Sequence, residues 1–141
     1  MSDLCGMSAP RLSRRSPAIA LQTPEGLLSA IHAKGSYLCV GLDPDPAKIP
    51  AAFGAGVEGM EAFCLAMVQA TQHVAVAYKP NLAFFEQYGA AGWAALERVV
   101  EQIPSDVLVI ADAKRGDIGN TATRYALSLI HISEPTRRLV I

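Results

Sequence analysis

Apolar and polar positions between residues 23 and 113 fall into blocks that fit helices and strands in turn. The segment TPEGLLSAIHAK (23–34) opens with a capping threonine, a proline and an acid, and Gly35 follows its last residue. This order predicts a helix that stops at Gly35. The next segment, YLCVGLD (37–43), is short, apolar and partly β-branched, and the prolines of the following DPDP prevent its extension. It predicts a buried strand, with a loop over residues 44–57.

The same alternation continues after this loop. From Glu58 onward, the apolar positions recur at steps of three and four residues, which predicts an amphipathic helix. The positions concerned are Met60, Phe63, Cys64, Met67, Val68 and Thr71. Residues 74–80 (VAVAYKP) predict a second buried strand that a proline closes. A second helix is expected from about Leu82 to Ile103, although Gly89 and Gly92 weaken its middle.

The third predicted strand is VLVIADA, residues 107–113, which follows a Pro-Ser break at 104–105. All three strands are continuous apolar runs rather than alternating ones. Such runs, separated by helices, are typical of parallel β/α units in which both faces of the sheet are covered. The pattern therefore predicts an α/β fold.

Composition narrows the class of protein. The chain has 141 residues, of which 51% are hydrophobic and 18% are charged, and its net charge is −1. These values are typical of one soluble domain and argue against nucleic-acid binding. No apolar run approaches the roughly 18 residues that a membrane span requires. Residues 1–22 contain three arginines but no sustained apolar segment, so we expect a flexible N-terminal arm, or a misplaced start codon, rather than a signal peptide.

The cysteines give no sign of a metal site or a disulfide framework. Cys5, Cys39 and Cys64 are an odd set without a Cys-x-x-Cys spacing, and the three histidines are scattered. Cys39 falls in an apolar strand and Cys64 on an apolar helical stripe, so both are expected to be small core residues. A reduced, cytoplasmic protein without a bound metal is predicted.

Charged residues stand at the ends of all three predicted strands. Asp43 ends the first, Lys79 the second, and Asp112 and Lys114 the third. Parallel strands present their carboxyl ends on one face, where ligands bind. Residues two apart on a strand point to the same side, and alternating acids and bases offset the burial of their neighbours. Asp117 would follow on the loop. An ordinary structural ion pair is the alternative.

Three segments carry a resemblance to a known family: GLDPDP (41–46), AYKPNLAFFEQYG (77–89) and VIADAKRGDIGNTA (109–122). Over about residues 25–126, the chain resembles orotidine 5′-phosphate decarboxylases whose first strand ends in Gly-Leu-Asp-Pro. The resemblance implies a (β/α)₈ TIM barrel and a carbon–carbon lyase of pyrimidine biosynthesis. It also implies a homodimer with active sites at the subunit interface, a small-molecule substrate, orotidine 5′-phosphate, and no metal or organic cofactor.

The resemblance also implies roles for individual residues. Lys114 would donate the proton to C6 of the pyrimidine, and Asp112 would lie against the substrate carboxylate. Asp117 would reach into the site of the partner subunit. The chemistry suits these residue types, because an ammonium group beside C6 stabilises the carbanion that forms when CO₂ leaves. The flanking acids are expected to keep Lys114 protonated.

Four residues would bind the substrate or complete the neighbouring site. By the same resemblance, Asp43 and Lys79 would hold the ribose hydroxyls, and Lys79 would join the charge network. Ile118 and Thr121 would supply an apolar contact and a hydroxyl contact to the neighbouring site.

The sequence departs from the family after residues 125–126. A complete barrel needs about 250 residues. The end of the chain, LSLIHISEPTRRLVI (127–141), looks like a translated sequencing adapter. We therefore expect residues 23–126 to form the N-terminal part of a decarboxylase barrel, without its phosphate-binding residues, followed by a non-native tail. A short native segment with a turn at 133–135 is the alternative.

Two other functions compete with this interpretation. A magnesium-dependent sugar-phosphate decarboxylase or aldolase could share the Asp-x-Lys-x-x-Asp motif. A non-catalytic fragment would instead associate through exposed strand edges, because an unpaired edge offers free backbone groups to another chain.

Overall fold

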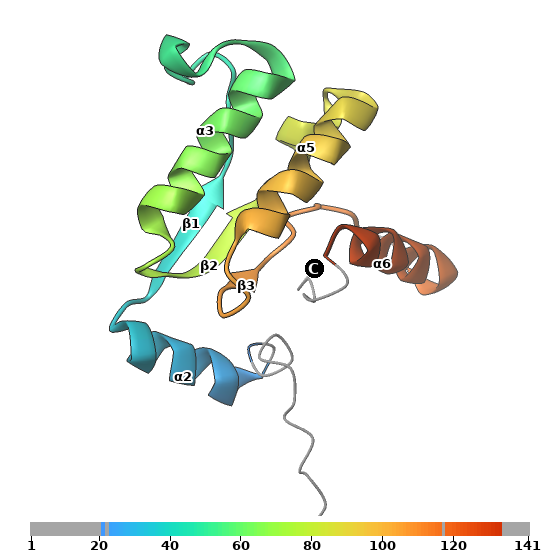
Figure 1. Cartoon of the computed structure of the whole chain (residues 1–141). Helices are drawn as coiled ribbons and strands as arrows, with labels where there is room; N and C mark the ends of the chain where they lie inside the picture. The colour runs from blue at the N-terminus through green and yellow to red at the C-terminus, as the bar shows by residue number, and fades with distance from the viewer. Residues whose placement is uncertain (1–20, 22, 117, 134–141) are drawn as a thin grey trace, which may run out of the picture.

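A parallel sheet of three strands, in the order β1–β2–β3, organises the protein in a computed structural model that describes residues 21, 23–116 and 118–133. Helices flank this sheet (Figure 1). In chain order the elements are α2 (Pro24–Lys34), β1 (Leu38–Leu42), the 3₁₀ helix η1 (Ala51–Phe53), α3 (Gly56–Thr71), β2 (Ala75–Pro80), α4 (Leu82–Glu86), α5 (Gly89–Gln102), β3 (Leu108–Val109) and α6 (Gly119–Ser133). The predicted alternation of helices and parallel strands is confirmed.

Helix α2 has the bounds that its capping residues predict. The hydroxyl oxygen of Thr23 accepts a hydrogen bond of 3.0 Å from the N–H of Gly26. At the other end, Gly35 adopts a left-handed conformation (φ 58°), and its N–H donates to the carbonyl of His32. A residue with a Cβ adopts that conformation only at a cost, so glycine ends the helix there.

Helices α3 and α5 pack side by side on one face of the sheet (Figure 1). The predicted apolar stripe of α3 is confirmed, because Met60, Cys64 and Val68 are buried against the sheet. Burial raises the pKa of the Cys64 thiol to about 12. Cys64 is therefore a neutral core side chain, as predicted.

The prediction of one helix over residues 82–103 is wrong, because the chain forms α4 and α5 with a break between them. Gly89, the first residue of α5, has a positive φ of 58°. At Gly92 the two helices meet so closely that a Cβ would lie 1.8 Å from the carbonyl oxygen of Phe85. The two glycines therefore allow a turn and a close contact between helices, rather than weakening one continuous helix.

The two faces of the sheet are covered unequally. Val109 and Ala111 belong to the main core under α3 and α5, whereas Leu108 and Ala77 pack with Leu21 on the side of α2. Helix α2 covers only part of this second face. Cys39 is consequently exposed, and the prediction that it lies in the core is wrong.

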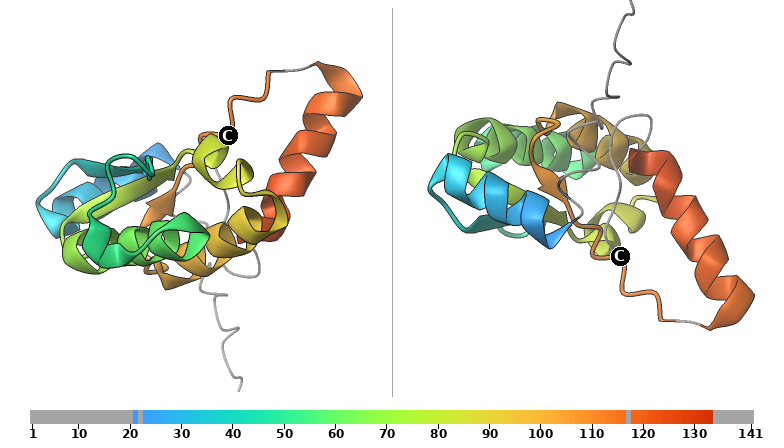
Figure 2. Two further views of the ribbon diagram at one scale, coloured as in Figure 1. Left: turned by 90° about the horizontal axis from the view of Figure 1, so that it is seen from above. Right: turned by 90° about the horizontal axis from the view of Figure 1, so that it is seen from below.

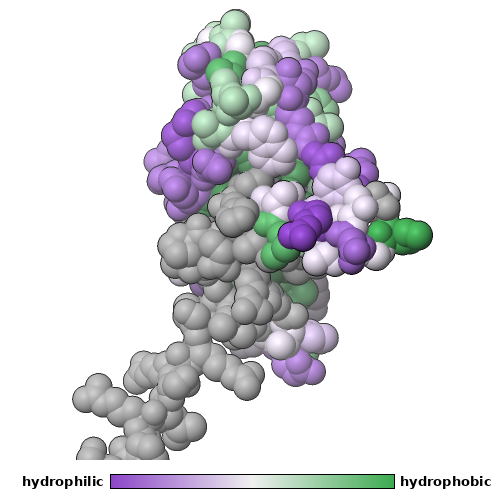
Figure 3. Space-filling model, turned by 90° about the vertical axis from the view of Figure 1, so that its right-hand side faces the viewer, coloured by the Kyte–Doolittle hydropathy of each residue, from purple (hydrophilic) through white to green (hydrophobic). Residues whose placement is uncertain are grey.

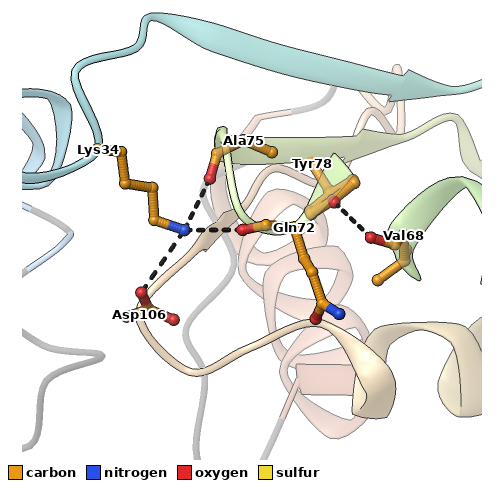
Figure 4. Close-up of polar contacts among 6 residues, drawn as sticks. All are labelled: Lys34, Val68, Gln72, Ala75, Tyr78 and Asp106. Carbon is orange, nitrogen blue, oxygen red and sulfur yellow. Dashed lines mark hydrogen bonds and ion pairs between the residues drawn. The ribbon is translucent and has the colours of Figure 1, made fainter. Parts of the chain in front are cut away.

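Lys34 ties three segments together at the amino ends of the strands (Figure 4). Its ammonium group donates hydrogen bonds to the carbonyls of Gln72 (3.1 Å) and Ala75 (2.9 Å) and lies 3.5 Å from a carboxylate oxygen of Asp106. Figure 4 also shows the Tyr78 hydroxyl donating to the carbonyl of Val68, at 3.1 Å. We call Lys34, Gln72, Ala75 and Asp106 the amino-end anchor.

The chain after β3 leads away from the sheet, and helix α6 runs back from this outer position toward α5 (Figure 2). Only its far end returns to the core, where Leu129 is buried near α5. On this side of the molecule, hydrophilic and hydrophobic residues are mixed, with only small hydrophobic patches (Figure 3). The helix continues through residues 127–133, and the rest of the predicted tail lies outside the described residues. No helix in the described part is long and apolar enough to cross a bilayer.

Candidate active site at the carboxyl ends of the strands

Three charged side chains meet where β2 and β3 end. One carboxylate oxygen of Asp112, Oδ2, lies 3.2 Å from the Lys79 ammonium nitrogen and 2.5 Å from that of Lys114. We call these residues the Lys-Asp-Lys cluster. The predicted proximity of these three residues is confirmed. The cluster lies at the edge of an open depression that is lined by Lys79 and residues 110–116.

Backbone hydrogen bonds fix Asp112 beyond the formal end of β3. The strand is shorter than the predicted 107–113, but Asp112 still forms an isolated parallel bridge with Asn81. The Asp112 N–H donates to the carbonyl of Pro80 (3.0 Å), and the Asp112 carbonyl accepts from the N–H of Leu82 (3.1 Å). The last residue of β2 and the first residue of α4 therefore hold both backbone groups of Asp112, and Lys79 lies on the same strand, β2.

Lys114 reaches Asp112 through a turn and not through strand alternation. The N–H of Ala113 donates to the carbonyl of Ala111 (3.0 Å), which bends the chain. Lys114 then adopts a left-handed backbone conformation with φ 51°. It is the one residue other than glycine with a positive φ in the described part of the chain. The sequence therefore placed Lys114 correctly beside Asp112, but for the wrong geometric reason.

The described residues show only part of the predicted charge network, because Asp117 lies outside them. A lysine between carboxylates stays a prediction, and among the described residues one carboxylate lies between two lysines. The hydrogen bond from Lys114, followed by that from Lys79, lowers the pKa of Asp112 below its ordinary value. Asp112 is therefore ionised at neutral pH, and the cluster carries one net positive charge when both lysines are protonated. Such a site attracts an anion.

The other predicted site residues that the structure describes are not members of this cluster. Asp43 is exposed just after β1, and its carboxylate makes no hydrogen bond or ion pair within the described residues. Ile118 and Thr121 are exposed where α6 begins. Asp117 lies outside the described residues.

The sequence did not reveal two further residues near the cluster. The side-chain oxygen of Asn81 is buried and has no hydrogen-bond partner in the described part of the chain. Its position directly after the second strand was a signal that could have marked it. Arg115 forms an ion pair with Glu86 and lies 5.4 Å from the ring centre of Tyr125. No sequence signal predicts these long-range partners.

No metal site accompanies the cluster in the described ranges. Among residues 21, 23–116 and 118–133, no group of three or more His, Cys, Asp or Glu side chains is placed to hold a metal ion.

Comparison with known proteins places this geometry in a family. A family model described as "Orotidine 5'-phosphate decarboxylase / HUMPS family" matches residues 36–134. An orotidine 5′-phosphate decarboxylase of Roseiflexus castenholzii is 52% identical over 105 residues, which is 74% of this chain and 38% of the relative. That of Flavobacterium johnsoniae is 48% identical over 107 residues, 74% of this chain and 39% of the relative.

A solved structure agrees with these relatives. The OMP decarboxylase of Leishmania donovani superimposes with a TM-score of 0.62 at 39% identity, over 75% of this chain and 40% of that one. The chain thus spans about two fifths of the length of the relatives that it matches. The family match extends past residue 126, while the foreign origin of residues 127–141 stays a prediction.

Proposed function

The chain belongs to the orotidine 5′-phosphate decarboxylase / HUMPS family, and we propose that it supplies catalytic residues for the conversion of orotidine 5′-phosphate to uridine 5′-phosphate and CO₂. The observation that carries the proposal is the Lys-Asp-Lys cluster at the carboxyl ends of parallel strands. The partial sheet is consistent with the N-terminal part of a TIM barrel, and barrel enzymes keep their active sites on this face.

Lys114 is the proposed proton donor. Loss of CO₂ leaves an electron pair at C6 that the pyrimidine ring does not delocalise. An ammonium group fixed beside C6 stabilises this charge and then protonates the carbon. The Lys114 side chain is largely exposed to the open depression, and a substrate can therefore approach its ammonium group.

Asp112 has two proposed tasks. It holds both ammonium groups through one carboxylate oxygen, which fixes their positions. Its negative charge also opposes the substrate carboxylate, and this repulsion disappears when the carboxylate leaves as neutral CO₂. The lowered pKa of Asp112 supports both tasks, because it keeps the group charged at neutral pH.

The remaining assignments follow the family resemblance. Lys79 and Asp43 bind the ribose hydroxyls, and Asp117 acts in the site of a partner subunit. Ile118, whose side chain is 86% exposed, and Thr121 contact that neighbouring site. The proposed assembly is a cytoplasmic homodimer whose reaction needs no metal or organic cofactor, and neither nucleic acid nor a membrane takes part.

A chimera tests the proposal, because the chain covers only part of its relatives. Residues 23–126 replace the aligned segment of the Roseiflexus castenholzii protein, and orotidine 5′-phosphate turnover is measured with and without EDTA. The 141-residue chain is assayed beside it. We expect turnover by the chimera that EDTA does not change. Lys114→Ala should abolish it, while Lys48→Ala, which removes an exposed lysine that pairs with Asp45 and not with Asp112, should not.

Two results would contradict the proposal. Near-normal turnover by the Lys114→Ala chimera would remove Lys114 from the mechanism. Metal-dependent turnover of a keto-sugar phosphate, in place of orotidine 5′-phosphate, would instead favour the sugar-phosphate enzymes that share the motif.

A further inference from the structure

The backbone of Lys114 requires a restraint. A left-handed conformation is unfavourable for a residue with a Cβ, and it persists only where the surrounding structure enforces it. Lys114 has φ 51°, and the two residues that follow it, Arg115 and Gly116, lie outside any strand or helix. Something must therefore hold the chain on both sides of this residue.

On its N-terminal side, the sheet provides the restraint. The N–H groups of Ile110 and Asp112 donate to the carbonyls of Tyr78 (2.8 Å) and Pro80 (3.0 Å). These bonds extend the β2–β3 ladder as far as Asp112, two residues before Lys114. The sheet thus fixes where the chain enters the turn, but not where it leaves.

On its C-terminal side, the restraint is Arg115. Its guanidinium group forms an ion pair with Glu86 at the end of α4, and both side chains are largely buried. The same guanidinium carbon lies 5.4 Å from the ring centre of Tyr125 on α6, within the range of a cation–π contact. The Arg115 side chain thus links the residue that follows the turn to both α4 and α6.

We propose that Arg115 is a positioning residue for Lys114: held between Glu86 and Tyr125, it keeps the Lys114 backbone in its left-handed conformation and so directs the ammonium group to Asp112. The importance of this role for turnover rests on the proposed function, but the geometric claim does not. The direction of Lys114 thus depends on a neighbouring residue whose side chain pairs with Glu86 and Tyr125 and not with Asp112.

The chain offers a matched control for this proposal. Arg98 forms a two-pronged ion pair with Glu61 between α3 and α5, with both N–O distances at 2.7 Å. It is likewise an arginine–glutamate pair between two elements, but it lies away from the carboxyl ends of the strands. A general effect of losing such a pair should appear equally in Arg98→Ala and Arg115→Ala.

The experiment uses NMR spectroscopy on the whole 141-residue chain. The Cα chemical shift of Lys114 reports its backbone conformation, and a ¹³C titration of the Asp112 carboxyl group reports the proximity of the ammonium group. In Arg115→Ala, the Lys114 shift should move away from the left-handed range, and the pKa of Asp112 should rise toward its ordinary value of about 3.9. In Arg98→Ala, both readings should stay as in the parent chain.

Further variants keep the test decisive if Arg115→Ala does not fold. Arg115→Lys retains the charge but loses the planar contact with Tyr125, and should shift both readings in the same direction by less. Tyr125→Phe should leave them unchanged, whereas Tyr125→Leu should not. Exchange of the charges in Glu86→Arg with Arg115→Glu should restore the parent values in part.

Unchanged readings in the folded Arg115 variants would overturn the positioning role, whatever the chimera does. Conversely, the readings can shift as expected while no chimera turns over orotidine 5′-phosphate. That result would retain the positioning role and contradict only the proposed function.

Discussion

The two ends of the sheet each hold a lysine beside an aspartate, and the burial of the two partners is reversed between them. In the amino-end anchor, the Lys34 side chain is 13% exposed and its partner Asp106 is 66% exposed. In the Lys-Asp-Lys cluster, Lys114 is 65% exposed and its partner Asp112 is 22% exposed. The same residue types therefore serve two purposes. A buried ammonium group stabilises the fold, and an exposed one is available for chemistry.

The use of hydrogen-bond donors explains this difference. A lysine ammonium group has three N–H donors. Lys34 directs its group to two backbone carbonyls and one carboxylate. Lys114 has one partner in the described part of the chain, Asp112. Within the described residues its remaining donors have no partner, as the proposed proton donor requires, whereas those of Lys34 are engaged within the fold.

The largest expected difference between the two lysines is in turnover. In the chimera, Lys114→Ala should reduce kcat by about 10⁴-fold or more, because both the proton donor and the charge beside C6 are lost. Lys34→Ala should leave kcat per folded molecule within a few-fold of the parent value. Steady-state assays, corrected for the folded fraction by circular dichroism, measure both. Comparable losses in the two variants would erase the distinction between structural and catalytic lysines.

Replacing Lys34 should lower folding stability more than replacing Lys114, which is the opposite of the order expected for turnover. Lys34→Met leaves two carbonyls without their charged donor and should lower the free energy of unfolding by about 2–4 kcal/mol. Lys114→Met removes an exposed side chain and should change it by less than about 0.5 kcal/mol. Urea denaturation of the 141-residue chain measures both changes, and equal m-values show that the unfolded states are comparable. A larger loss for Lys114→Met would contradict this order.

Sequence patterns predicted interactions between residues that are close along the chain. They missed interactions between residues that are distant along it. The bounds of α2 follow from Thr23 and Gly35, whose capping interactions lie within four residues along the chain. Lys34 is adjacent to this cap, yet its partners are the carbonyls of residues 72 and 75, and no local pattern marks it. The same limit applied to the break between α4 and α5, which depends on the close contact of the two helices at Gly92.

The sequence predicted which residues form the site, but not the contacts that orient them. Charged residues at the ends of apolar strands identified Lys79, Asp112 and Lys114, because parallel topology alone brings strand ends together. Topology does not determine which charge lies in the middle or which turn aims Lys114. The order of charges around Lys114 therefore stays a prediction, and Arg115 was missed. Cys39 was placed in the core because its apolar neighbours do not reveal that the second face of the sheet is only partly covered.

The titration of Asp112 should separate the effects of its two lysines. The hydrogen bond from Lys114 contributes most to the lowered pKa, so Lys114→Met should raise that pKa more than Lys79→Met does. Because the folded pKa lies below the unfolded value of about 3.9, the stabilisation is complete above that pH and is lost as the pH falls through the folded pKa. Lys34→Met, at the other end of the sheet, should not change this titration. A ¹³C NMR titration of the carboxyl group measures all three variants, and an equal rise in all of them would indicate a general loss of structure.

The smallest expected effect concerns Asp106, the exposed acid of the amino-end anchor. Its carboxylate oxygen lies 3.5 Å from Lys34, and water screens most of this attraction because the side chain is 66% exposed. Asp106→Asn should therefore lower the free energy of unfolding by less than about 0.5 kcal/mol, and added salt should reduce the difference further. Urea denaturation at low and high salt measures this change beside that of Lys34→Met. If Asp106→Asn were as damaging as Lys34→Met, the anchor would depend on its ion pair. A small effect would instead leave the carbonyls of residues 72 and 75 as the groups that require a buried ammonium at this end of the sheet.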